Sequence, residues 1–293
     1  MKKITLLLIL LLSINIIGCI KSKSKNISKL EEEKAYVKAE KVSKGSLSQY
    51  IRFAGDIHGE DEATVYPKAT GILLKNTVTE GEFVRKGSII ALIDRNEVGY
   101  KFNKYPVESP LTGIVGRLLL ARGETVYPQT PVAIIADIGR VKIKINISEK
   151  DLGYISHGQE AKVIVDTYPK EGFIGYINKI SPMLDPQTRT CPSEIIVDNT
   201  GHRLKPGMFA HVEMKIKEKA GIYYTTQEAI SREGNGYYIF IAKNGKEEKR
   251  KVTIGLREKD KIELTSGILG NENIITVGKE KLKNGTLIEI TNE

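Results

Sequence analysis

The feature that most constrains the fold of this chain is an internal repeat with a fixed offset of 42 residues. Residues 65–72 recur as residues 107–114, and both copies end in Thr-Gly-Ile. The register then holds over glycine and apolar positions, with Gly81 matching Gly123, Val84 matching Val126, and Leu92-Ile93 matching Ile134-Ile135. A short strand-rich unit cannot bury its apolar face alone, so the sequence predicts that the two halves pack as a pair.

The repeat resembles the biotinyl/lipoyl domain, a flattened sandwich of two interlocked halves. Carrier members of that family present one lysine on a tight hairpin between the halves. Here the junction spans residues 95–106, which is too long for a two-residue turn. Its lysines, Lys101 and Lys104, lack the Met-Lys-Met or Asp-Lys-Ala setting of a modified lysine. The junction therefore predicts a surface loop with solvated lysines, not a cofactor carrier.

The N-terminus has the pattern of a targeting segment. Lys2 and Lys3 precede a run of Leu and Ile that is short for a membrane span. The Ile-Ile-Gly-Cys sequence that ends at Cys19 resembles a bacterial lipobox, which implies cleavage of the signal peptide 1–18 and acylation of Cys19. The alternative is an uncleaved N-terminal anchor with an ordinary cysteine. Both alternatives place the rest of the chain outside the cytoplasm, and we expect it in the periplasm, anchored to the inner membrane by an N-terminal lipid.

The charge pattern disfavours binding to nucleic acid and leaves the role of the basic run near the N-terminus open. The formal net charge is +9, and the densest basic run follows the lipid site at Lys21, Lys23, Lys25 and Lys29. We expect residues 19–35 to be a flexible tether whose lysines either meet anionic headgroups or are only solvated. Trp is absent and no basic helix stands out, which disfavours a nucleic-acid partner.

Cys191 is the only thiol besides Cys19, so the sequence predicts no disulfide framework and no Cys-based zinc site.

Short alternating strands separated by Gly, Pro and Asp turns fill the rest of the chain. The prediction is a mainly β protein with one short helix at residues 149–155, capped by Ser148. We expect lead strands at 36–63, a lipoyl-like sandwich at 64–137 with halves 64–94 and 107–137, a small β-barrel at 138–217 and a β domain at 218–293. The lead strands have no neighbours to pair with, so we expect them to pair with strands after residue 138.

Glycines and one proline are expected to set the turns. Positive φ is sterically cheap only for glycine, so the paired positions Gly71/Gly113 and Gly81/Gly123 predict equivalent backbone turns in the two halves. Pro206 and Gly207 fit the central positions of a type II turn.

The order of these parts resembles the periplasmic adaptor subunits of bacterial efflux pumps, the membrane fusion proteins of the HlyD type. Residues 180–190 resemble the Ser-Pro…Asp-Pro-x-Thr-Arg-Thr stretch of that family, and residues 203–210 resemble its Leu-Lys-Pro-Gly-Met-x-Ala turn. The resemblance implies a barrel-sandwich hybrid, a β-barrel and a membrane-proximal domain. Most family members carry a long helical hairpin between the lipoyl halves. Residues 95–106 are too few for one, so we expect the variant that lacks it.

The resemblance implies a structural coupler between an inner-membrane resistance-nodulation-division (RND) transporter and an outer-membrane channel. We expect the adaptor to form a ring of three or six copies, and to serve the export of drugs or other toxic amphiphiles. Arg85 and Lys86 in one lipoyl turn, and the equivalent turn at residues 124–128, are candidates for lining the ring, with ordinary turn residues as the alternative. Arg189 is either a partner contact or a structural arginine that bonds loop carbonyls.

Other functions stay open or are disfavoured. An adaptor of an ATP-driven (ABC-type) exporter or of a metal efflux system, and a surface lipoprotein that binds a ligand, are the alternatives. The scattered histidines His58, His157, His202 and His211 have no metal-ligand spacing. No nucleophile elbow or phosphate-binding loop occurs. The sequence therefore predicts no enzyme activity, no cofactor and no metal site.

Overall fold

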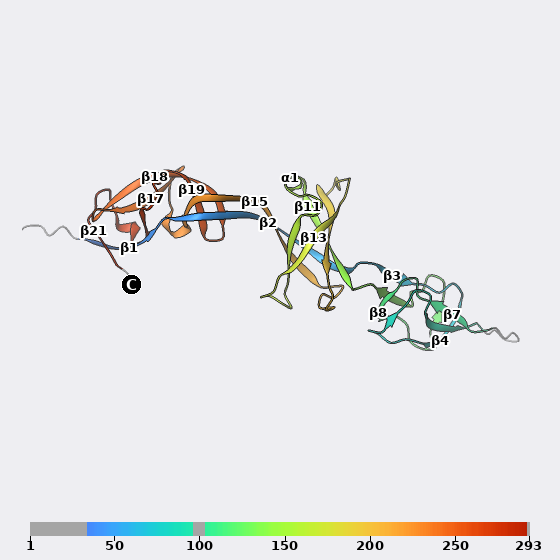
Figure 1. The fold of residues 1–293 in the computed structure, drawn as a ribbon. Helices are drawn as coiled ribbons and strands as arrows, with labels where there is room; N and C mark the ends of the chain where they lie inside the picture. The colour runs from blue at the N-terminus through green and yellow to red at the C-terminus, as the bar shows by residue number, and fades with distance from the viewer. Residues whose placement is uncertain (1–33, 96–102, 292–293) are drawn as a thin grey trace, which may run out of the picture.

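The computed structural model describes residues 34–95 and 103–291, and in it the chain forms three β bodies in a row (Figure 1). The predicted signal peptide, Cys19, most of the tether and Lys101 lie outside the described residues. The mainly β fold class with one short helix is confirmed. No helix within the two described segments is long and apolar enough to cross a bilayer.

The lipoyl-like body consists of two four-stranded sheets that interlock the halves of the repeat. One sheet has the order β3-β10-β8-β5 and the other β7-β6-β4-β9. The strands are β3 (Glu62–Val65), β4 (Gly71–Asn76), β5 (Phe83–Val84), β6 (Ile89–Asp94), β7 (Tyr105–Glu108), β8 (Gly113–Leu118), β9 (Thr125–Val126) and β10 (Ala133–Ala136). Each sheet takes its two outer strands from one half of the repeat and its two inner strands from the other half, so the two halves are interleaved.

The 42-residue offset is reproduced by the strands themselves. β4 and β8, and likewise β5 and β9, have equivalent bounds in the two halves. Leu73 and Val115 are equivalent positions, and both are fully buried in the same apolar core. The prediction that the two halves pack as a pair is therefore met by a shared core.

The central body is a closed antiparallel barrel. Its strand order is β12-β13-β14-β11-β2-β15, and a further pairing of β12 with β15 closes it. The strands are β2 (Ser43–Gly59), β11 (Arg140–Ser148), β12 (Glu160–Val165), β13 (Phe173–Ile180), β14 (Thr190–Asp198) and β15 (Phe209–Thr226). Alternating inward residues fill the interior, as along β11, where Val141, Ile143, Ile145 and Ile147 are buried.

The one α-helix of the described residues, α1 (Glu149–Leu152), follows β11. It is shorter than the predicted 149–155. Ser148 occupies the N-cap position in extended geometry, but its side chain makes no capping hydrogen bond. Gly153 ends the helix, and the backbone N–H groups of Tyr154 and Ile155 bond back to Asp151 and Leu152 as a turn. Ile155 is buried in the barrel core, and we attribute the early end of the helix to the packing of that side chain.

The C-terminal body contains β1 (Ala35–Lys41) together with the last strands of the chain. These are β16 (Ser231–Glu233), β17 (Gly236–Lys243), β18 (Lys246–Glu258), β19 (Lys261–Ser266), β20 (Asn273–Val277) and β21 (Ile288–Ile290), with the 3-10 turns η1 (Gln227–Ala229) and η2 (Lys279–Lys281). β1 lies between β20 and β21. The first and last described strands are therefore neighbours.

A long antiparallel ribbon of β2 and β15 joins the barrel to the C-terminal body (Figure 1). Its register runs from Phe209 opposite Asp56 to Tyr224 opposite Ser43, with two irregularities along β15. β2 and β15 pair with barrel strands at one end, and β15 pairs with β19 at the other. β1 and β2 thus find their partners in strands after residue 138, while β3 joins the lipoyl-like body.

Candidate functional surfaces and pocket

Two equivalent turns mark the lipoyl-like body. Gly81 has φ +87° and Gly123 has φ +90°, and no atom lies within 4 Å of the position where a Cβ would stand. The Gly81 N–H donates to the Val115 carbonyl, and the Gly123 N–H donates to the Leu73 carbonyl, both at 2.8 Å. Each turn therefore ties its own half to the strand of the other half.

Gly71 and Gly113 are explained differently from the prediction. They open β4 and β8 and do not have positive φ. A Cβ on Gly71 would stand 2.3 Å from the Asp94 carbonyl oxygen, and one on Gly113 would stand 2.4 Å from that of Ala136. The requirement at these positions is close approach of two backbones, not a turn conformation.

The next turn of each half carries different chemistry on the same turn hydrogen bond, although Gly87 has φ +86° and its equivalent, Gln129, does not have positive φ. In the first half the Ser88 N–H donates to the Arg85 carbonyl at 2.9 Å, and in the second the Thr130 N–H donates to the Tyr127 carbonyl at 2.8 Å. Arg85 and Lys86 are exposed, and Tyr127 is 52% exposed. One turn thus presents two cations, and its counterpart presents an aromatic ring.

Arg189 lies in the β13–β14 turn, beside α1. Its φ is +53°, and its backbone N–H donates to the Asp185 carbonyl at 2.8 Å. The Asp185 carboxylate accepts from the backbone N–H groups of Gln187 and Thr188, so the backbone of this loop is held without the arginine side chain. The guanidinium of Arg189 is exposed and makes no hydrogen bond or ion pair with any described residue. The alternative of a structural arginine that bonds loop carbonyls is not realised here.

Pro206 and Gly207 form a turn that is docked on the barrel. Gly207 has φ +89°, and the Met208 N–H donates to the Lys205 carbonyl at 3.1 Å. The Gly207 N–H donates to the Ile57 carbonyl at 2.8 Å, which fixes the turn against β2. Lys205 is exposed.

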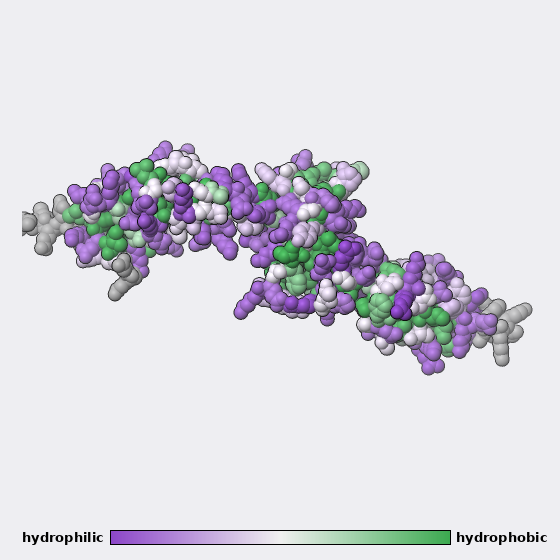
Figure 2. Space-filling view, in the orientation of Figure 1, coloured by the Kyte–Doolittle hydropathy of each residue, from purple (hydrophilic) through white to green (hydrophobic). Residues whose placement is uncertain are grey.

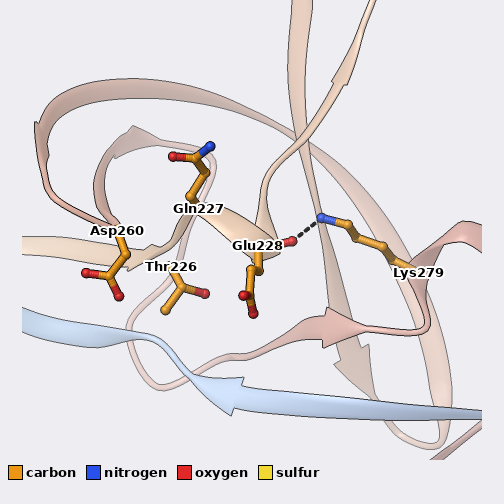
Figure 3. A pocket seen from close by; sticks show the side chains of 5 residues that line it. All are labelled: Thr226, Gln227, Glu228, Asp260 and Lys279. Atoms are coloured by element: carbon orange, nitrogen blue, oxygen red, sulfur yellow. Dashed lines mark hydrogen bonds between the residues drawn. The ribbon is translucent and has the colours of Figure 1, made fainter.

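A small polar pocket lies in the C-terminal body and is formed by residues far apart in the chain (Figure 3). Its volume is about 450 Å³, and its lining residues are Thr226, Gln227, Glu228, Asp260 and Lys279. The Lys279 ammonium donates to the backbone carbonyls of Glu228 and Ile230. Burial lowers the pKa of Lys279 below its usual value. Sequence reasoning missed this pocket, because no local motif joins residues of η1, the β18–β19 turn and η2.

The amine of Lys279 donates to two carbonyl oxygens, and the lining of the pocket includes no histidine, serine or cysteine. Across the described ranges, no group of three or more His, Cys, Asp or Glu side chains is arranged to hold a metal ion.

Models of three domain families match the chain in the order of its bodies. Residues 61–137 match the barrel-sandwich hybrid domain of RND membrane fusion proteins, residues 140–218 match the CusB-like β-barrel domain, and residues 227–290 match the YknX C-terminal permuted SH3-like domain. The matched ranges follow the lipoyl-like body, the barrel and the C-terminal body described above.

The matches to curated relatives cover only part of each relative's length. The multidrug resistance protein MdtA of Xenorhabdus bovienii is 24% identical over 63% of this chain and 47% of its own. The macrolide export protein MacA of Yersinia pestis is 27% identical over 58% of this chain and 47% of its own. The chain therefore spans about half the length of the curated relatives it matches.

Solved structures share the fold. The structure of MacA from Actinobacillus actinomycetemcomitans has a TM-score of 0.60 at 18% identity and covers 81% of this chain and 98% of that one. ZneB from Cupriavidus metallidurans has a TM-score of 0.52 at 18% identity and covers 85% and 94%.

A long helical hairpin has no room between the lipoyl halves of this chain. β6 ends at Asp94 and β7 begins at Tyr105, so residues 95–104 are all that connect them. The three domain models in their order, the relatives and this short junction together confirm the resemblance drawn from the sequence: the chain belongs to the membrane fusion protein family of efflux adaptors, in a form without the long helical hairpin.

Proposed function

We propose that this chain is a lipid-anchored periplasmic adaptor that couples an inner-membrane RND transporter to an outer-membrane channel. The observation that carries the proposal is the row of three bodies, two of which are joined by the long β2–β15 ribbon, since a bridging subunit has to span a distance between its partners. The names of MdtA and MacA support drugs or similar amphiphiles as the exported substrates.

The unequal turns of the lipoyl-like body support ring formation. A ring of identical subunits needs head-to-tail contacts, in which two different surfaces of one subunit meet. The Arg85-Lys86 turn and the Tyr127 turn occupy equivalent positions of the repeat and differ in chemistry, since one presents cations and the other an aromatic ring. A cation over a tyrosine ring is attractive by about 0.5–1 kcal/mol at an exposed site. Arg85 of one copy against Tyr127 of the next is therefore our proposed ring contact.

Cysteine crosslinking between single variants tests this contact. Arg85→Cys and Tyr127→Cys proteins, each with Cys19→Ser, are mixed with a short thiol crosslinker, so only an intermolecular bond can form. Cys191 is fully buried and does not compete. We expect a dimer band in the mixture that exceeds the band in either variant alone. The control is a mixture of Arg85→Cys with Tyr154→Cys, since Tyr154 is exposed on the barrel. A dimer band as strong in this control as in the mixture of Arg85→Cys with Tyr127→Cys would show random encounter instead.

Pull-down of the tagged full-length protein after crosslinking in living cells tests the partners. We expect to recover a large polytopic transporter and an outer-membrane channel. Recovery of neither, from a protein that external protease cleaves on intact cells, would favour a surface lipoprotein. Recovery of an ATP-driven exporter would keep the adaptor function and replace the RND transporter.

A further inference from the structure

Three segments of the chain meet at one end of the C-terminal body. The Ala35 N–H donates to the Leu287 carbonyl at 2.8 Å, and the Ile288 N–H donates to the Gly245 carbonyl at 2.9 Å. The start of β1, the β17–β18 turn and the approach to β21 therefore lie side by side. Figure 1 places β1 and β21 at the outer end of this body, away from the barrel.

Lysines gather at this end. We define the basic end by four exposed residues, Lys34, Lys243, Lys246 and Lys283. Lys246 and Lys283 make no ion pair with any described residue, whereas Lys34 pairs with Glu289 at 3.4 Å.

Two acidic groups lie beside the β17–β18 turn, one of them paired with cations and the other buried. Glu248 is bound by Arg250 and lies 3.8 Å from Lys243. Glu247 is buried, and one of its carboxylate oxygens accepts from the Gly285 N–H at 3.0 Å, while the other has no hydrogen-bond partner among the described residues. Among the exposed groups named here, only Lys246 and Lys283 have no ion pair with a described residue, so the exposed unpaired charge is positive.

Apolar groups stand beside the lysines on the outer face of β1. Tyr36 is 68% exposed, whereas its neighbour Val37 is 1% exposed and points into the core. Lys38 therefore faces outward with Tyr36, and its partner on β20 is Val277, which is 50% exposed. Figure 2 shows apolar residues among the hydrophilic ones over this body. Tyrosine and long lysine side chains are the residues that settle at the boundary of a bilayer and water.

The chain that precedes the basic end also points to a membrane. Residues 20–33 separate Cys19 from Lys34 and span at most about 50 Å when fully extended. A lipid on Cys19 would therefore hold the basic end close to the surface that carries the lipid, at a high effective concentration.

We propose that the basic end docks on anionic phospholipid headgroups, with Tyr36 at the interface and the four lysines on the phosphates. This rests on the proposed membrane tether only for its effect in the cell, because the surface itself needs no acyl chain to bind. The contact would hold the long axis of the adaptor in a defined orientation to the bilayer, which a flexible tether alone does not provide.

Vesicle sedimentation tests the charge contribution. The protein is residues 19–293 with Cys19→Ser, and the vesicles are phosphatidylethanolamine with phosphatidylglycerol, or phosphatidylcholine alone. Each lysine near an anionic surface contributes roughly a fivefold increase in partition. We therefore expect Lys243→Gln, Lys246→Gln and Lys283→Gln together to lower binding to the anionic vesicles by roughly a hundredfold. A control with the exposed barrel lysines changed, Lys144→Gln, Lys162→Gln and Lys179→Gln, loses the same charge and should bind nearly as the parent does.

A single tryptophan tests the orientation. The chain has no Trp, so Tyr36→Trp and the barrel control Tyr154→Trp each report one position. We expect a blue shift of the Tyr36→Trp emission on addition of anionic vesicles, and none for Tyr154→Trp, which is 56% exposed in the free protein.

Other results would overturn the proposal. An equal loss of vesicle binding in the two triple variants would mean that only the net charge of the protein matters. Equal binding of the parent to anionic and to phosphatidylcholine vesicles would mean that headgroup charge does not drive the contact. Binding only to vesicles that contain the transporter would assign the surface to a protein partner. All of these outcomes leave the pull-down of transporter and channel unaffected, so failure here and failure of the adaptor function are distinguishable.

Discussion

Lys219 and Glu263 form an ion pair between β15 and β19, at the point where the ribbon enters the C-terminal body. The ammonium lies 2.8 Å and 3.0 Å from the two carboxylate oxygens, and the Glu263 side chain is 4% exposed. The same carboxylate accepts from the Leu256 N–H at 2.7 Å. Burial acts to raise the pKa of Glu263, but the hydrogen bonds from Lys219 and Leu256 outweigh it, so the pKa lies below the usual 4.5.

Loss of this pair should destabilise the C-terminal body. Lys219→Met leaves a buried carboxylate without its cation, and we expect a loss of about 1–3 kcal/mol in the free energy of unfolding at neutral pH. The control is Lys215→Met, which removes an exposed pair with Glu218 and should cost under about 0.5 kcal/mol. Urea unfolding measures both, and equal losses would contradict the prediction.

The same pair makes stability depend on pH. Because the pKa of Glu263 is lowered in the folded protein, its contribution is present above the unfolded value of 4.5 and is lost as pH falls through the folded pKa. In Lys219→Met the largest cause that lowers the pKa of Glu263 is removed, while burial still acts to raise it, so we expect that pKa to rise. We therefore expect the gap in melting temperature between parent and variant to narrow from pH 7 to pH 4, and a constant gap would argue against the assignment.

Two glycines on one strand should respond differently to alanine. A Cβ at Gly113 would meet the Ala136 carbonyl oxygen at 2.4 Å, whereas one at Gly116 would stand 3.4 Å from that of Ile134. We expect Gly113→Ala to cost about 1–3 kcal/mol and Gly116→Ala under about 0.5 kcal/mol. Thermal unfolding of the two variants checks this order.

Replacing the hydroxyl of Thr226, which lines the pocket, should stabilise the protein. The Thr226 Oγ1 is buried and has no hydrogen-bond partner among the described residues. A buried hydroxyl without a partner is unfavourable, so Thr226→Val should raise stability by about 1 kcal/mol. Thr276→Val is the control, since that hydroxyl donates to the Lys38 carbonyl and its loss should lower stability. The midpoints of urea unfolding check that Thr226→Val gains stability and that Thr276→Val loses it.

Arg189 should matter for assembly and not for stability. Its side chain is exposed and unpaired within the described residues, so Arg189→Ala should change the free energy of unfolding by less than about 0.5 kcal/mol. If the guanidinium contacts a partner, the same variant should reduce recovery of that partner in the crosslinked pull-down, with Arg189→Lys intermediate. Unchanged recovery would leave Arg189 as a solvated residue.

The lipoyl-like body was the most predictable part of the fold. The offset between its halves can be read from the residues alone, and turn glycines such as Gly81 and Gly123 mark backbone conformations that other residues adopt poorly. Gly71 and Gly113 look equivalent to these in the sequence. Only the folded chain shows that they are needed for contact with Asp94 and Ala136, because that contact joins residues distant in the chain.

The end of the helix and the pocket could not be predicted from the sequence. Residues 149–155 have a helical pattern, but burial of Ile155 in the barrel outweighs the small gain of another helical turn. The pocket joins Thr226, Asp260 and Lys279, and the basic end joins Lys34, Lys246 and Lys283, through long-range strand pairing that no local pattern records.

The sequence by itself determined the repeated strands, the mainly β class and the family, because these depend on periodicity and on local turn chemistry. The tertiary structure decided which charges are paired and which are free. An ion pair such as Lys219 with Glu263 is separated by 44 residues. It exists only because two strands lie side by side, and its strength depends on burial that the whole body provides.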